Sequence, residues 1–232
     1  MVMTKPSILA LFVGIFLAGM MSGCNTKIDE RYPNAPEGLS VTGAAGRIAE
    51  TGEELVDPYI TCSKESASGI VGLKLYRSDD SQNGTYKLIP NSEEEWFNGS
   101  PVARDRTTDR NHTYYYKVSS FTNEGKESPL SSETITFRFL DVLEQIQPAE
   151  DAVVQADSPF TLSWDSSQEL DSYVVVIQKD MEWHWQEKTS STSCIVEGLK
   201  PGNYRWWIQG LKYASQRDCT ATVSKWRYFT VR

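Results

Sequence analysis

The sequence predicts an all-β protein that contains two consecutive β-sandwiches, and three observations support this prediction. From Pro36 onward, short apolar segments alternate with polar residues and are separated by Gly, Pro, Asn, Asp and Ser, as in strands joined by turns. No long stretch has apolar residues at the helical period. Of the 232 residues, 209 remain after a 23-residue leader, which is about twice the ~100 residues of one sandwich domain. We therefore expect two domains.

The first half contains a recognisable pair of strands. Leu73 and Leu75 alternate with more polar neighbours within residues 72–77, as expected for a half-buried strand. A polar turn over residues 79–84 follows, and a second segment occupies residues 85–89. These segments predict a hairpin.

Together with motifs further along the chain, this half resembles a bacterial fibronectin type III domain. Residues 72–78 resemble strand C, residues 113–118 resemble strand F, and residues 124–129 resemble the turn that follows it. One departure is Cys62, which ends a segment where strand B of that family usually carries a core tryptophan. The resemblance implies a first domain over residues 34–139.

The second half repeats the scheme. Its motifs in order resemble strand B with its core residue Trp164, strand C, the E–F corner with strand F, and strand G, at residues 160–164, 173–177, 199–206 and 229–231. The resemblance implies a second fibronectin type III-like domain over residues 140–232. Because the connection near residues 139–143 is short and apolar, we expect the two sandwiches to dock rather than swing on a free linker.

Residues 1–23 have the features of a lipoprotein signal peptide. After Lys5, an apolar run of 14 residues extends from Ile8 to Met21; it is shorter than the roughly 20 residues that span a bilayer and suits a secretory signal. Small residues and then Cys24 follow, which resembles the lipobox of bacterial lipoproteins. The resemblance implies cleavage before Cys24, acylation of that cysteine with fatty acids such as palmitate, and a tether over residues 24–33. An ordinary signal peptide or a buried helix is the alternative.

The residues after Cys24 bear on localisation. Asn25 is not the aspartate that retains some lipoproteins at the inner membrane, so the outer membrane of a bacterium is favoured. Asp29 and Glu30 loosely resemble the acidic signals that send some lipoproteins to the cell surface, which leaves the periplasmic and surface locations open. The formal net charge of −8 argues against a nucleic-acid partner, because an acidic surface repels phosphates.

The sequence offers little material for catalysis, and we expect no enzyme activity, no cofactor and no metal. The only histidines are His112 and His184, and neither stands in a catalytic motif. Residues 79–84 match the start of a calcium loop, but Pro90 occupies the position of the closing glutamate, so a plain hairpin turn is favoured. Zinc-spaced Cys/His pairs and glycine-rich phosphate loops are absent from the sequence.

Three cysteines follow Cys24. If the fibronectin type III topology holds, the start of strand E and the F–G turn lie at one end of the second sandwich, which implies a disulfide between Cys194 and Cys219. Cys62 lies in the other domain and is expected to be a small buried core residue. The alternative is three reduced, buried thiols.

Six of the seven tryptophans lie in the second half of the chain. Strand alternation places Trp206 and Phe229 inward, so Trp207 and Tyr228 should face outward on neighbouring strands. The predicted ligand-binding face comprises Trp207, Trp226 and Tyr228. One of Trp183 and Trp185 is expected to join them, and Arg205 and Gln209 lie nearby.

An aromatic face of this kind has three interpretations. Flat rings beside amides and charges suit stacking on sugars, and they also suit contacts with protein. Alternatively, the face is covered by the first domain or by the loop at residues 179–192. The expected function is a non-catalytic, membrane-anchored binding or adhesion module that binds a glycan; the alternative is a scaffolding envelope lipoprotein that contacts other proteins. An exposed tryptophan platform would favour glycan binding, and its burial between the domains would favour scaffolding.

Overall fold

The structure is a computed structural model that describes residues 32–48, 54–97, 99–165 and 170–232. The predicted leader, Cys24 and most of the 24–33 tether lie outside these residues. Within them, no helix is long and apolar enough to cross a membrane.

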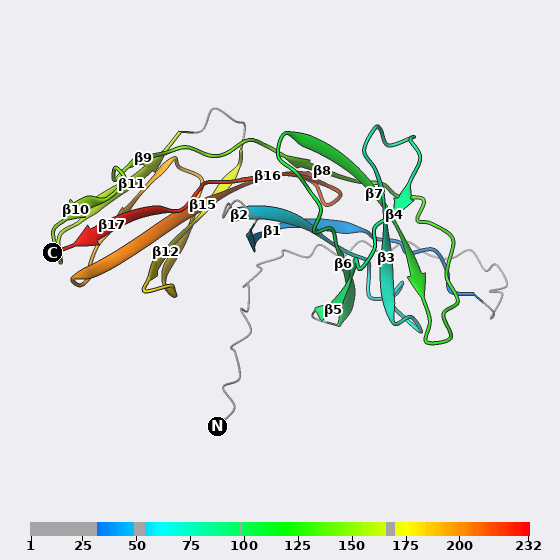
Figure 1. The fold of residues 1–232 in the computed structure, drawn as a ribbon. Helices are drawn as coiled ribbons and strands as arrows, with labels where there is room; N and C mark the ends of the chain where they lie inside the picture. The colour runs from blue at the N-terminus through cyan, green and yellow to red at the C-terminus, as the bar shows by residue number, and fades with distance from the viewer. Residues whose placement is uncertain (1–31, 49–53, 98, 166–169) are drawn as a thin grey trace, which may run out of the picture.

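Strands are the regular elements of the described chain (Figure 1). In chain order they are β1 (Ser40–Ile48), β2 (Glu54–Thr61), β3 (Gly72–Ser78), β4 (Lys87–Leu88), β5 (Glu93–Phe97), β6 (Ser100–Arg104), β7 (His112–Phe121), β8 (Ile135–Phe139), β9 (Gln145–Gln147), β10 (Ala152–Val154), β11 (Phe160–Trp164), β12 (Ser172–Lys179), β13 (Glu182–Thr189), β14 (Ser193–Val196), β15 (Gly202–Ser215), β16 (Asp218–Val223) and β17 (Arg227–Val231). The predicted all-β architecture is confirmed.

The first sandwich is built from β1 to β8. A four-stranded sheet of order β1-β2-β6-β5 packs against β3, β4, β7 and β8, and β3 and β4 form the predicted hairpin. Ile60, Leu75, Tyr116 and Phe137 are fully buried between the layers. Cys62 is buried in the same core, as the sequence predicts.

The second sandwich is built from β9 to β17. A three-stranded sheet of order β14-β11-β9 packs against β12, β15 and β17, with β13 at one edge beside β12 and β10 parallel to β17 at the other. Trp164, Trp206, Phe229 and Val231 point into its core, which confirms the alternation predicted for these strands.

The two sandwiches share one sheet. β15 is 14 residues long; its first part pairs with β17 inside the second sandwich, and its last part pairs with β16. β16 in turn pairs in parallel with β8 of the first sandwich, so the β15–β16 hairpin links both halves in Figure 1. The docking predicted from the short connection is therefore present, and it takes the form of continuous strand pairing.

Side chains from the hairpin also complete the core of the first sandwich. Leu211, Cys219 and Ala221 are buried there with residues of β1 and β2. Gly43 of β1 permits the close approach, because a Cβ atom at this position would lie 3.2 Å from both the Ala221 Cβ and the Leu211 Cδ2 atoms. The amide nitrogen of Gln209 donates to the carbonyl oxygen of Gly43 at 3.0 Å. We call this contact between β1–β2 and the β15–β16 hairpin the joint.

Candidate functional site

The outer face of the second sandwich carries a row of four side chains, which we call the aromatic row. Strand register aligns Trp183 with Gln178, Gln178 with Arg205, and Arg205 with Tyr228, across β13, β12, β15 and β17. The two aromatic residues at its ends are 50% and 47% exposed, respectively. Three strand spacings of ~4.8 Å place the outer strands ~14 Å apart. The row therefore presents two exposed rings with a polar pair between them.

Hydrogen bonds fix the centre of the row. The Nε and Nη2 atoms of Arg205 both donate to the Oε1 atom of Gln178, at 2.9 and 2.7 Å. The guanidinium carbon also lies 4.0 Å from the ring centroid of Trp226, a cation–π contact. Arg205 is thereby held by an amide and an indole ring at once.

The back of this cluster reaches the first sandwich through Glu54 of β2. The Glu54 side chain is buried and accepts a hydrogen bond from the Trp226 indole. Burial raises the pKa of Glu54 to about 7 from 4.5, although the Trp226 hydrogen bond and the charge of Arg205 act to lower it. The guanidinium of Arg110 adds a bridge, because it donates to the backbone oxygens of Glu54 and Val223 at 2.8 and 3.1 Å.

Trp207 corrects the predicted exposed platform. Its side chain does point away from the second core, as alternation requires, but it is only 5% exposed and lies in the core of the first sandwich with Val176 and Leu211. Trp226 is partly buried against the same core and contacts Trp207 edge to face, with ring centroids 5.9 Å apart. The prediction was wrong for Trp207 because β15 continues into the joint, where β1 and β2 cover its outer face.

The choice between the two tryptophans of β13 depends on a bulge. Trp185 pairs with Ile177 and packs against the second core, whereas Trp183 pairs with Gln178 after a register shift and shares its outer face. Only Trp183 thus joins the aromatic row. No residue pattern in the sequence marks this bulge, although the bulge decides which of the two rings faces outward.

The cysteines also require a correction. In the described chain Cys62, Cys194 and Cys219 are all free and buried. Cys194 belongs to the core of the second sandwich and Cys219 to the core of the first. The predicted bridge is absent because the F–G hairpin, which that topology would leave at one end of the second sandwich, extends into the first sandwich and carries Cys219 with it.

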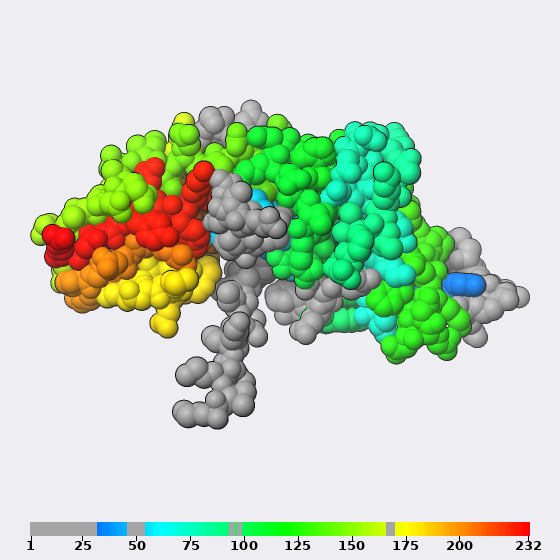
Figure 2. Space-filling model, viewed as in Figure 1, coloured from blue at the N-terminus to red at the C-terminus, as the bar shows by residue number. Residues whose placement is uncertain are grey.

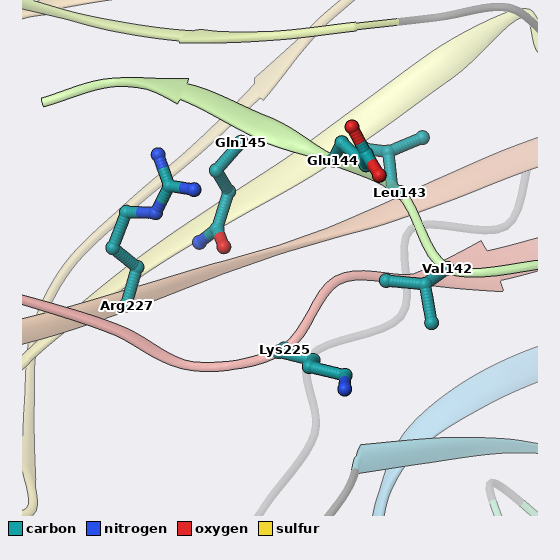
Figure 3. A pocket seen from close by; sticks show the side chains of 6 residues that line it. All are labelled: Val142, Leu143, Glu144, Gln145, Lys225 and Arg227. Carbon is teal, nitrogen blue, oxygen red and sulfur yellow. The ribbon is translucent and has the colours of Figure 1, made fainter. Parts of the chain in front are cut away.

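A polar pocket lies where the chain passes from the first sandwich to the second. Its volume is about 430 Å³. Figure 3 shows the six lining side chains, which are Val142, Leu143, Glu144, Gln145, Lys225 and Arg227. No sequence pattern predicts this pocket, because its residues form no motif and meet only through the fold. In the part of the chain that the structure describes, no three His, Cys, Asp or Glu side chains form a cluster that could hold a metal ion.

Comparisons with known proteins add little to this geometry. No family model and no curated protein match the chain. Among solved structures, the FN1-FN3 domains of chicken CNTN1 are similar at 17% sequence identity and a TM-score of 0.40, over 86% of this chain and 65% of that chain. The chain thus spans less than two thirds of the length of that structure. So distant a likeness does not bear on function, and the all-β architecture rests on the strand pairing described above.

Proposed function

We propose that the chain is an exported, lipid-anchored and non-catalytic binding module whose aromatic row contacts a glycan. The observation that carries this proposal is the placement of two exposed rings, Trp183 and Tyr228, at the ends of one row on one sheet face. The anchor is inferred from the sequence alone, from the apolar leader that ends at Cys24.

The chemistry of the row suits an extended saccharide. Apolar faces of sugar rings stack on aromatic side chains, and sugar hydroxyls need fixed hydrogen-bonding groups nearby. Gln178 and Arg205 supply an amide and a guanidinium that are already held in place by their mutual hydrogen bonds. Because the outer strands are ~14 Å apart, a ligand that contacts both rings would be an oligosaccharide rather than one sugar. Pre-ordered groups lose little conformational freedom on binding.

The second candidate function is a scaffold that contacts other envelope proteins. The burial of Trp207 in the joint favours it, because that ring stabilises the arrangement of the two sandwiches and is not free to bind a ligand. A rigid pair of sandwiches on a lipid anchor would hold a partner at a fixed distance from the membrane.

Binding assays with the solubilised full chain separate the two functions. Trp183→Ala and Tyr228→Ala should each weaken binding to glycans on an array by about tenfold, a typical loss for one aromatic contact, without lowering the melting temperature. Trp96→Ala is the matched control, because Trp96 is a partly exposed tryptophan of the first sandwich. Absence of any bound glycan, together with specific capture of an envelope protein, would replace glycan binding with scaffolding.

A further inference from the structure

The pocket beside the connection between the sandwiches opens at a fork between two chain segments. Leu143 and Ser224 form an isolated parallel bridge. Beyond this bridge, β9 pairs with β11 in the three-stranded sheet, whereas β17 pairs with β15 in the other sheet. The segments therefore diverge into different layers, and the pocket occupies the wedge between them (Figure 3).

The walls of the fork differ in charge. Lys225 and Arg227 line one wall, and Glu144 and Gln145 line the other. The lining thus carries two cations and one carboxylate in a chain whose net charge is −8. Because both cations stand on one wall, an anionic group of a ligand would be favoured against that wall.

Two of the lining side chains are held in place before any ligand arrives. Gln145 is only 8% exposed, and its amide nitrogen donates to the backbone oxygen of Trp206 at 3.0 Å. Arg227 donates from Nη1 to the backbone oxygen of Pro148 at 3.2 Å, and its Nε atom lies 3.9 Å from a Glu150 carboxylate oxygen. That last contact is long and partly exposed, so it leaves room for a better placed carboxylate.

We propose that this fork binds a carboxylate-bearing sugar unit, such as a uronic acid, and thereby gives the chain a preference for acidic glycans. The sugar carboxylate would accept hydrogen bonds from Arg227, since a planar guanidinium matches carboxylate geometry, and the charge of Lys225 on the same wall would add electrostatic attraction. Glu144 and Gln145 would accept hydrogen bonds from sugar hydroxyls on the opposite wall. The volume of about 430 Å³ lies in the usual range for small-molecule pockets, roughly 300–1,000 Å³.

This inference rests on the proposed glycan function, but the fork is separate from the aromatic row. Arg227 and Tyr228 are neighbours in β17, and alternation turns them to opposite faces of the sheet. Single sugars can therefore probe the fork, and oligosaccharides can probe the row.

The test compares methyl glucuronide with methyl glucoside at low ionic strength, using the full chain and isothermal titration or NMR. We expect the glucuronide to bind about tenfold more tightly, equivalent to ~1.4 kcal/mol, and to shift the backbone amide signals of residues 142–145 and 224–228. Lys225→Gln and Arg227→Gln should each reduce that preference. Lys64→Gln, which removes an exposed lysine of the first sandwich, should leave it unchanged. Arg227→Lys should fall between, since it keeps the charge but loses the planar fork of donors.

Distinct results would overturn the inference. Equal affinity for the two sugars, or a preference that survives both Gln substitutions with normal folding, would refute it. Displacement of the glucuronide by acetate at the same concentration would show a site for any carboxylate rather than for a sugar. A different result would refute glycan binding by the aromatic row alone. In that case Trp183→Ala and Tyr228→Ala would leave oligosaccharide binding intact, and the preference for glucuronide would persist.

Discussion

The two sandwiches differ in how their cores are completed. The second core is formed entirely by residues from Leu143 to Val231. The first core also contains six buried residues from the second half of the chain, which are Val176, Trp207, Leu211, Cys219, Ala221 and Val223. The second sandwich therefore forms its core from its own residues, whereas the core of the first sandwich depends on residues of the second.

Separating the halves should have the largest effect. Residues 34–139 expressed alone should fail to unfold cooperatively, because the missing second half removes the strand beside β8 and six buried side chains of the first core. Residues 140–232 should retain a cooperative transition, since their core is intact. Circular dichroism melts and amide spectra of both fragments test this difference. A sharp melt of the first fragment, similar to that of the full chain, would show that the shared core is dispensable.

Two neighbouring residues of β15 contribute to different cores. Trp206 lies in the second core and Trp207 in the first. We expect Trp206→Ala and Trp207→Ala each to cost about 3–5 kcal/mol of stability. Hydrogen exchange should then show loosened β11 amides in the first variant and loosened β1 and β2 amides in the second. Among the described residues, the Trp207 indole N–H has no hydrogen-bond partner, so Trp207→Phe should cost much less.

A melting temperature unchanged by Trp207→Ala would contradict burial in the joint. It would also restore Trp207 to the list of exposed ligand contacts.

The joint should also respond to pH. Because burial raises the native pKa of Glu54 from 4.5 to about 7, the native state holds this proton more tightly than the unfolded state. Stability should therefore fall as pH rises from about 4.5 to about 7, by on the order of 2–3 kcal/mol, and remain low above that range. Denaturant unfolding of Glu54→Gln, which is neutral at every pH, should lack this slope and exceed the parent in stability at pH 8.

Glu127 of the first sandwich should show the opposite pH dependence to Glu54, because its pKa is lowered rather than raised. Although burial acts to raise the pKa of Glu127, hydrogen bonds from Lys74, Ser119 and Tyr76 outweigh it and lower the pKa to about 2. Its contribution is lost only as pH falls from about 4.5 towards 2. Glu127→Gln should therefore leave the slope above pH 5 unchanged. A slope of equal size in Glu54→Gln would assign that pH dependence to another group.

The sequence predicted the strands better than it predicted the surfaces. Alternation correctly placed Trp164, Trp206 and Phe229 inside, because the period of two is a local property of a strand. It also turned Trp207 away from the second core. Alternation could not predict which element covers the outer face of β15, because that depends on how far β15 extends and on the pairing of β16 with β15 and β8.

The candidate site was predictable only in part for the same reason. Tyr228 and one tryptophan of β13 were expected on the outer face, but the bulge that selects Trp183 has no marker in the sequence. The fork brings together residues about 80 positions apart, as in the Leu143–Ser224 bridge, and only the strand pairing reveals it.

The smallest expected effect concerns the cysteines, which test whether Cys194 and Cys219 lie in different cores without any substitution in the chain. A bridge between Cys194 and Cys219 would close a loop of 25 residues and stabilise the second sandwich by roughly 3 kcal/mol. With Cys194 in one core and Cys219 in the other, reductant should instead leave the melting temperature unchanged. Burial raises the pKa of each of these two thiols to about 12, so alkylation should be slow until the chain unfolds. Mass spectrometry of protein alkylated before and after denaturation measures this directly. Recovery of a Cys194–Cys219 peptide pair from non-reduced protein would mean that the β15–β16 hairpin folds back onto the second sandwich, and the shared sheet would be lost with it.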